Sequence, residues 1–304
     1  MIHTLGAYMI LLDGKLVASE MLTTLKREVA VLHEQKIEPT LHVVVVGSNR
    51  VVDLYVKQKS KTAKKIGIKI IMHKVTAPFS TQKVVQVITR LNAQKNCHGI
   101  IVQLPLPEKV NTDKVIWAIA PHKDVDGFQM RLFRPPTPSA ILDLLTFYHI
   151  PVMRKKVTII GNGRLVGKPL SVLMQKRGAH VSVCTHTTRD IASRVRNADI
   201  IVSAAGVPGC VAKNMVHEHH VIVDAGTSSE GGTIHGDVAF ADVAPLVSAI
   251  SSTPGGVGPV TVAELLKNVV IAARTYGIKE SHTHTKSPKT DHSTAGPFVK
   301  RIHT

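Results

Sequence analysis

The sequence predicts an α/β fold built on parallel sheets. Apolar, β-branched runs that are typical of buried strands alternate with stretches of helical character, and this alternation is the pattern of a parallel sheet covered by helices. A break at Pro151 is followed by a second series of the same kind, which opens with a glycine-rich turn between a strand and a helix. A chain of 304 residues is long enough for one or two such domains.

The individual elements follow from local patterns. In the first half we expect strands at 41–47, 69–72 and 98–103, and helices over 54–66, over 81–94 with Thr81 as its N-cap, and ending at 143–148. In the second half we expect strands at 156–160, 180–184, 198–204 and 220–224, and a helix over 169–176. The tail 281–304 is rich in His, Thr, Ser and Lys, has no periodicity and is expected to be disordered.

The chain is strongly basic, with 38 Lys and Arg against 21 Asp and Glu and a formal charge of +17. Such a charge favours anionic partners, either nucleic acid or anionic metabolites such as dinucleotides. Aromatic residues make up only 4% of the chain, and a single-strand nucleic-acid binder needs aromatic rings on which to stack bases. We therefore expect no nucleic-acid partner, and the charge reflects either small anionic partners or simply a basic proteome and solubility.

Further composition signals bear on location. No apolar run approaches the roughly 18 residues that a membrane-spanning helix needs, so we expect no membrane partner. Residues 1–12 are mildly apolar but lack a basic region and a clear cleavage site, and we interpret them as a short extension before the first strand, not a signal peptide. Three scattered cysteines, Cys97, Cys184 and Cys210, fit a reducing cytoplasm and predict neither a disulfide framework nor a metal site.

The glycine-rich turn reads Gly161-Asn162-Gly163, with Gly167 opening the next helix. Glycines let the backbone approach a pyrophosphate, and a helix N-terminus supplies partial positive charge. The spacing is one residue longer than the common dinucleotide fingerprint. In this strand–turn–helix setting we favour a bound dinucleotide over a plain tight turn.

The strand after this turn ends in a segment that bears on the choice of cofactor. Sites for NAD usually place Asp or Glu there to bind the ribose hydroxyls. Here the region holds Thr187 and Arg189, which favours the 2′-phosphate of NADP, while the nearby Asp190 keeps NAD open. The alternative is that Thr187 only caps the following helix.

A second group of polar residues precedes Pro151. Tyr55 and Lys59 are four residues apart and share a face if their stretch is helical, where a phenol and an ammonium can orient a substrate and move a proton. Taken alone, this stretch is more typical of a solvated lysine-rich helix. Gln103 ends an apolar strand, where α/β sheets place functional side chains. Residues 122–128 form a polar loop with two carboxylates, and residues 254–259 form a stiff glycine-rich loop before a helix.

Seven short segments occur in order along the chain. They are Gly47-Ser48-Asn49, Tyr55-Val56-x-x-Lys59, Val102-Gln103-Leu104-Pro105-Leu106-Pro107, Lys123-Asp124-Val125-Asp126-Gly127-Phe128, Pro136-Thr137-Pro138, Val166-Gly167-Lys168-Pro169 and Pro254-Gly255-Gly256-Val257-Gly258-Pro259-Val260-Thr261. Each is modest alone, but the ordered set is specific. Over roughly Leu11 to Gly277 the sequence resembles the bifunctional methylenetetrahydrofolate dehydrogenase/cyclohydrolase family.

The resemblance implies two α/β domains around a cleft. Residues 1–140, completed by the last helix over 260–277, would bind folate, and residues 141–259 would form a Rossmann-like NADP-binding domain. It implies a cytoplasmic enzyme of one-carbon metabolism and purine biosynthesis, commonly a homodimer through its dinucleotide domain. The enzyme would oxidise 5,10-methylenetetrahydrofolate to the methenyl cation with NADP and hydrolyse that cation to 10-formyltetrahydrofolate. No metal is implied.

The resemblance also implies residue roles. Lys59 would assist water attack and proton transfer, Gln103 would hydrogen-bond Lys59, Tyr55 would orient the folate, and Asp126 would hold the pterin. The substrate site would further include Gly255, Gly256 and Pro259. The cofactor site would comprise Gly161, Asn162, Gly163, Arg164, Gly167, Thr187, Gly226 and Thr227.

The chain departs from the family pattern in four places. Val52 replaces a serine near the folate pocket, Pro136 replaces the cysteine of Pro-Cys-Thr-Pro, Gly226-Thr227-Ser228-Ser229 replaces Gly-Ile-Asn-Arg, and the loop after His186 is one residue short. The last two changes touch the cofactor side and leave both NADP and NAD open. The competing hypotheses are a dehydrogenase without cyclohydrolase activity, a shikimate-dehydrogenase-like enzyme, and a basic nucleic-acid-binding protein.

Overall fold

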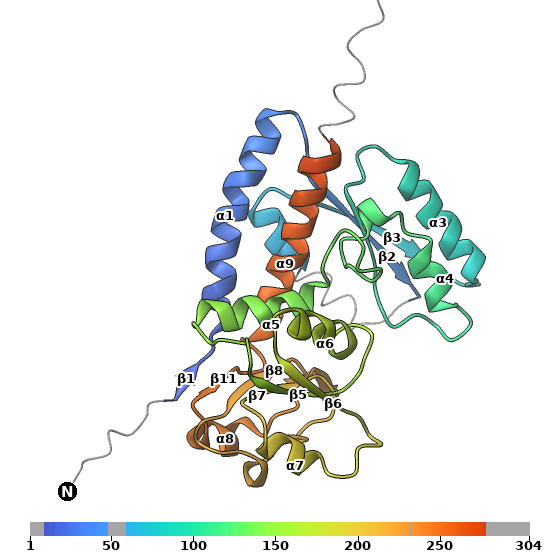
Figure 1. Cartoon of the computed structure of the whole chain (residues 1–304). Helices are drawn as coiled ribbons and strands as arrows, with labels where there is room; N and C mark the ends of the chain where they lie inside the picture. The colour runs from blue at the N-terminus through green and yellow to red at the C-terminus, as the bar shows by residue number, and fades with distance from the viewer. Residues whose placement is uncertain (1–8, 48–58, 231–232, 278–304) are drawn as a thin grey trace, which may run out of the picture.

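The computed structural model describes residues 9–47, 59–230 and 233–277, and within them it contains two separate parallel sheets (Figure 1). The smaller sheet has the order β3-β2-β4, with β2 at Thr40–Val46, β3 at Lys69–Val75 and β4 at Gly99–Val102. The larger has the order β1-β11-β8-β7-β5-β6. Its strands are β1 (Ile10–Leu11), β5 (Lys156–Ile160), β6 (His180–Cys184), β7 (Ile200–Ser203), β8 (Val221–Asp224) and β11 (Ala249–Ile250). The α/β prediction is therefore confirmed.

Helices and short elements connect these strands. The helices are α1 (Gly14–Glu34), one over 59–65, α3 (Thr81–Ala93), α4 (Thr112–Trp117), α5 (Pro136–Phe147), α6 (Gly167–Lys176), α7 (Ile191–Arg196), α8 (Phe240–Val243) and α9 (Val257–Ala272). Short 3₁₀ turns lie at Pro121–Lys123, Lys213–Met215 and Ala244–Leu246, and a π-helical turn, Ala273–Gly277, follows α9. A hairpin of β9 (Ser228–Glu230) and β10 (Thr233–His235) leaves the larger sheet after β8. No helix among the described residues is long and apolar enough to cross a membrane.

The strands expected at 156–160 and 180–184 have these bounds in the structure, and the other expected strands differ only at their ends. The N-cap prediction for α3 is wrong. The cap is Ser80, whose Oγ accepts a hydrogen bond from the Lys83 N–H at 3.2 Å. The Thr81 hydroxyl instead accepts one from the Asn111 N–H at 2.8 Å. Two adjacent hydroxyl residues are equal candidates in sequence, and a contact with a distant loop separates them.

Part of the N-terminal extension is in fact a strand. Ile10 and Leu11 pair in parallel with Ala249 and Ile250, so β1 forms one edge of the larger sheet. Two residues are too short for any periodic signal. The tail 281–304 and the first part of the helix expected over 54–66 lie outside the described residues.

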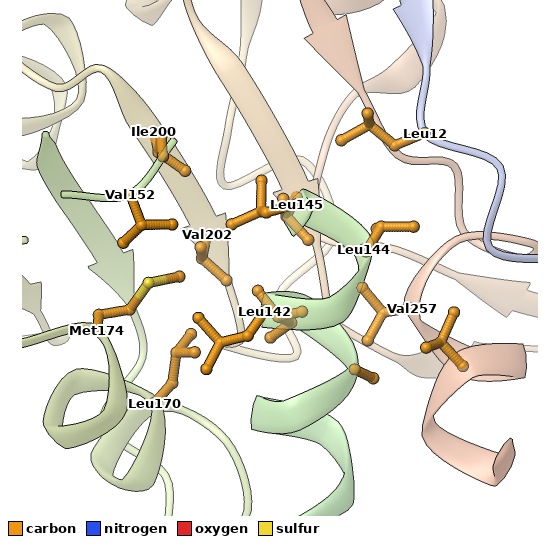
Figure 2. Close-up of a cluster of buried hydrophobic side chains, with 14 of the residues drawn as sticks. Leu12, Leu142, Leu144, Leu145, Val152, Leu170, Met174, Ile200, Val202 and Val257 are labelled. Atoms are coloured by element: carbon orange, nitrogen blue, oxygen red, sulfur yellow. The ribbon is translucent and has the colours of Figure 1, made fainter. Parts of the chain in front are cut away.

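Two of the four apolar cores among the described residues show how the helices pack on the two sheets. Leu265, Leu266, Val269 and Val270 of α9 pack with apolar residues of α1 and β2, so the last helix returns to the smaller sheet. Helix α9 runs alongside α1 and also contacts α5 near its lower end in the view (Figure 1). Leu142 and Leu145 of α5 pack with α6 and the larger sheet (Figure 2). Helix α5 thus packs on the larger sheet and also contacts α9, which packs on the smaller sheet.

Two buried histidines predict acid sensitivity. His42 on β2 has Nδ1 2.9 Å from Nε2 of His73 on β3, and burial followed by the charge of His73 lowers its pKa to about 4. His220 is fully buried, and burial followed by His219 lowers its pKa to about 4. Both values lie below the ordinary 6.5. At these two histidines the unfolded chain therefore binds more protons than the folded chain between about pH 6.5 and 4, and the stability that they contribute is lost as the pH falls through that range.

The measurement compares His42→Gln with the wild type by urea unfolding at pH 7.5 and pH 5.0. The comparison is needed because burial raises the pKa of Asp124 to about 6 and of Glu264 to about 7, and these groups act in the opposite direction. We expect the change in unfolding free energy between the two pH values to shift by about 1–2 kcal/mol in the variant, because one proton-binding difference is removed. If the unfolding free energy changes with pH by the same amount in both proteins, the lowered pKa of His42 is contradicted.

Candidate active site

The structure brings Lys59, Gln103 and Asp126 together. Gln103 follows β4 directly, and its backbone N–H donates to the Val44 carbonyl at 2.9 Å, which holds the residue at the carboxyl end of the smaller sheet. Lys59 Nζ, at the start of the 59–65 helix, donates to Gln103 Oε1 at 3.4 Å. All three side chains are half-buried. Burial raises the pKa of the Asp126 carboxyl, and the charge of Lys59 opposes the rise, so the two side chains lie close enough to interact.

The two carboxylates of the polar loop have different surroundings. Asp124 is buried and accepts hydrogen bonds from the N–H groups of Phe128 at 3.2 Å and Gln129 at 2.8 Å. These bonds close the turn 124–129. Gly127 has φ +63° and a Cβ there would lie 2.7 Å from the backbone of Arg134, so the turn requires glycine. Asp124 therefore shapes the loop, and Asp126 lies beside Lys59.

Two residues to which the sequence patterns assign no role support this loop through hydrogen bonds. Lys123 is buried, and its Nζ donates to the carbonyls of Leu91, Asn92 and Gln94 at 3.2, 2.8 and 2.7 Å. Asn268 on α9 donates through Nδ2 to the Val125 carbonyl at 2.8 Å and the Arg134 carbonyl at 3.0 Å. An asparagine within a strongly apolar helix was the available signal, because buried polar groups need partners.

The other predicted substrate residues lie around the start of α9 or fall outside the described residues. Tyr55 and Val52 fall outside the described residues. Gly255 has φ +114°, and Gly256 packs so tightly that a Cβ on Gly14 would lie 1.7 Å from its carbonyl oxygen. Gly255, Gly256 and Pro259 therefore form the junction between α1 and the start of α9.

The glycine-rich turn has the geometry that a dinucleotide needs. Gly161 has φ +105°, and a Cβ there would lie 2.4 Å from the Ala204 carbonyl oxygen. A Cβ on Gly167 would lie 1.9 Å from the Gly161 carbonyl oxygen, whereas a Cβ on Gly163 would meet nothing within 4 Å. The fold thus requires the outer glycines, and the middle one leaves exposed backbone facing open space before α6. This arrangement fits a pyrophosphate at the helix N-terminus.

The side chains of Thr187 and Asp190, after β6, show which of the two caps the following helix. Asp190 caps α7, since its Oδ1 accepts a hydrogen bond from the Ser193 N–H at 2.8 Å. The hypothesis that Thr187 caps this helix is therefore wrong. The Thr187 hydroxyl lies 2.8 Å from that of Thr185 and is exposed.

Three further cofactor candidates lie in the glycine-rich turn itself or after β8. Arg164 forms an ion pair with Asp113, in the first turn of α4, and this pair links the glycine-rich turn to the half that carries the smaller sheet. Gly226 and Thr227 follow β8 at the carboxyl end of the larger sheet, Gly226 buried and Thr227 exposed.

This fold and site define a class: a two-sheet α/β dehydrogenase with a dinucleotide turn on one sheet and a lysine–amide–carboxylate group on the other. Residues 12–126 match the model of the tetrahydrofolate dehydrogenase/cyclohydrolase catalytic domain, and residues 135–276 match that of its NAD(P)-binding domain. The chain belongs to the tetrahydrofolate dehydrogenase/cyclohydrolase family.

Individual relatives agree with this membership. The bifunctional protein FolD of Helicobacter hepaticus is 42% identical over 276 residues, covering 87% of this chain and 96% of that protein. FolD of Aquifex aeolicus is 40% identical, covering 90% and 97%. The crystal structure of the bifunctional FolD enzyme of Campylobacter jejuni has a TM-score of 0.85 at 37% identity, covering 88% and 99%. That of Trypanosoma brucei, complexed with NADP cofactor and inhibitor, has a TM-score of 0.83 at 32% identity, covering 88% and 97%.

The chain is therefore a bifunctional enzyme of one-carbon metabolism. It oxidises 5,10-methylenetetrahydrofolate to the 5,10-methenyl form with NADP and hydrolyses this product to 10-formyltetrahydrofolate. Among the described residues, no group of three or more His, Cys, Asp and Glu side chains is placed to hold a metal ion.

Proposed function

We propose that Lys59, Gln103 and Asp126 carry the hydrolytic step and hold the pterin. The observation that supports this is the hydrogen bond from Lys59 to Gln103, made beside Asp126 at the carboxyl end of the smaller sheet. Lys59 assists attack of water on the methenyl carbon and moves the proton that the water loses. Gln103 holds Lys59 in place, Asp126 binds the pterin by hydrogen bonds, and Tyr55 orients the ring. Breaking one C–N bond of the adduct then yields the formyl group.

The proposed cofactor site lies on the larger sheet. Bound NADP supplies the acceptor for the hydride that leaves the methylene carbon. Gly161, Asn162, Gly163 and Gly167 hold its pyrophosphate at the start of α6, and Arg164 and Thr187 bind its phosphate groups. Gly226 and Thr227 border the nicotinamide. Support comes from the open space over Gly163 and from the position of these residues at the ends of parallel strands.

The proposed domains divide the work in the same way. Residues 1–140 with the helix 260–277 form the folate-binding domain, and residues 141–259 form the NADP-binding domain. Packing of α9 against α1 and β2 supports this division. Strand β1 lies in the larger sheet and ties the start of the chain to the NADP-binding domain.

The proposed assembly is a cytoplasmic homodimer formed through the NADP-binding domain. Strand β6 is an edge of the larger sheet, and an open groove of about 850 Å³ runs along it between β5 and α7. Val183 on this strand is 36% exposed. An unpaired edge strand is a ready surface for a second copy. Analytical ultracentrifugation of the purified chain tests the dimer, and a monomer at micromolar concentration would contradict it.

The experiment for the proposed function follows the absorbance of the methenyl product. Purified protein receives 5,10-methylenetetrahydrofolate with either NADP or NAD, and in a second assay it receives methenyltetrahydrofolate alone. We expect methenyl to form with NADP and to decay in both assays. If supplied methenyl decays but neither cofactor yields it, the proposed cofactor residues are wrong. If the supplied methenyl is stable, the proposed role of Lys59, Gln103 and Asp126 is wrong.

A further inference from the structure

Two buried aspartates lie at the carboxyl end of the larger sheet, where β8 leads into the β9–β10 hairpin. Asp224 ends β8 and is 3% exposed, and Asp237 follows β10 and is 0% exposed. Asp224 accepts hydrogen bonds from the Ser203 hydroxyl at 2.9 Å and the Asp237 N–H at 3.1 Å. The two carboxylates therefore close the base of the β9–β10 hairpin. Neither residue belongs to the predicted site.

Asp237 joins two loops that are far apart in sequence. Its Oδ2 accepts hydrogen bonds from the N–H groups of Ala205 at 2.7 Å and Gly206 at 3.1 Å, in the exposed loop after β7. The same carboxyl lies against Gly226, after β8, where a Cβ would be 1.9 Å from Asp237 Cγ. Strands β7 and β8 are neighbours, with Ser203 paired to Asp224 at their carboxyl ends. One buried side chain thus fixes both loops at the same edge of the sheet.

We propose that Asp237 is a positioning residue for the dehydrogenase reaction, holding the loops after β7 and β8 in the arrangement that receives the nicotinamide half of the cofactor. This rests on the proposed cofactor role of Gly226 and Thr227. Ligands of open parallel sheets bind outside the carboxyl ends of the strands. Hydride transfer requires aligned reacting atoms, and a displacement of about 1 Å costs about 100-fold in rate. Loss of Asp237 frees the 204–207 loop and removes the surface on which Gly226 rests.

The bifunctional enzyme supplies its own control, because Lys59, Gln103 and Asp126 are held by the other sheet. In Asp237→Ala we expect dehydrogenase kcat/KM with NADP to fall about 100-fold, with a raised KM for NADP, while hydrolysis of supplied methenyltetrahydrofolate is unchanged. Asp237→Asn keeps one acceptor oxygen for Ala205 and Gly206, and it recovers part of the loss. The matched control is Asp199→Asn. Asp199 Oδ2 accepts a hydrogen bond from the Lys156 N–H at 2.7 Å at the opposite end of the same sheet, and this variant keeps both activities.

The outcomes separate a positioning role from a structural one. If the two activities of Asp237→Ala fall together in proportion to the unfolded fraction, or if dehydrogenase activity and the KM for NADP do not change, the inference is overturned. If the alanine variant does not fold, Asp237→Asn is used to test the positioning role instead. Its ratio of dehydrogenase to cyclohydrolase rate falls below the wild-type ratio if Asp237 positions the loops, and equals it if Asp237 only stabilises the fold. Wild-type protein that makes no methenyl with NADP contradicts the proposed cofactor site itself, and the inference then falls with it.

Discussion

Replacing Lys59 by methionine is expected to abolish hydrolysis of methenyltetrahydrofolate while the dehydrogenase continues to produce it. Methionine matches much of the lysine side chain in length, but it has no ionisable group and therefore neither a positive charge nor a proton that it can transfer. The hydrogen bond from Lys59 to Gln103 Oε1 is lost, and so is the positive charge beside Asp126. General acid–base catalysis contributes about 10²- to 10⁴-fold, so we expect the hydrolytic rate to fall by about 10³-fold. The measurement is the decay of methenyl absorbance after direct addition.

A lysine of the same helix provides the control for this variant. Lys64 is exposed, so Lys64→Met removes an equal charge from the same short helix without touching Gln103. We expect it to hydrolyse methenyltetrahydrofolate at the wild-type rate. Equal losses in the two variants would mean that the general basicity of this helix, and not Lys59, supports the reaction. A selective loss of the dehydrogenase in Lys59→Met would instead place Lys59 in the hydride-transfer step.

How well the sequence predicts this site depends on how far apart its residues lie along the chain. The glycine-rich turn could be identified because strand, turn and helix follow one another within about a dozen residues, and each has its own local signal. Lys59, Gln103 and Asp126 come from three separate segments. Their convergence could be expected because the carboxyl ends of parallel strands meet at one edge of a sheet, and because the ordered motifs resemble a known family.

The features that sequence reasoning missed are contacts between distant segments. Asp237 holds Ala205 and Gly226, and Asn268 holds the backbone before Asp126, across 143 residues of chain. A single buried polar residue has no periodicity, so its partner cannot be found from spacing. Strand β1 was missed for a related reason, because two residues gain strand geometry only by pairing with β11.

The glycine-rich turn carries the second large expected effect. In Gly167→Ala, the new Cβ would lie 1.9 Å from the backbone oxygen of Gly161, and backbone cannot rotate aside as a side chain can. The start of α6 must move, and with it the proposed pyrophosphate site. We expect a destabilisation of about 1–3 kcal/mol from overpacking and a fall of about 100-fold in dehydrogenase kcat/KM from misplacement of the cofactor. Hydrolysis of supplied methenyltetrahydrofolate, measured alongside thermal unfolding, should persist in the folded protein.

Gly163→Ala separates the needs of the fold from those of the cofactor. No protein atom lies within 4 Å of a Cβ at this position, so thermal unfolding should match the wild type. A pyrophosphate lying against this backbone would meet the added methyl group, because glycine in a dinucleotide turn permits the close approach of backbone and phosphate. We therefore expect a raised KM for NADP with unchanged stability, the opposite balance to Gly167→Ala. A KM equal to that of the wild type would show that the cofactor does not approach Gly163, and the proposed pyrophosphate site would then have to be moved along the turn toward Arg164.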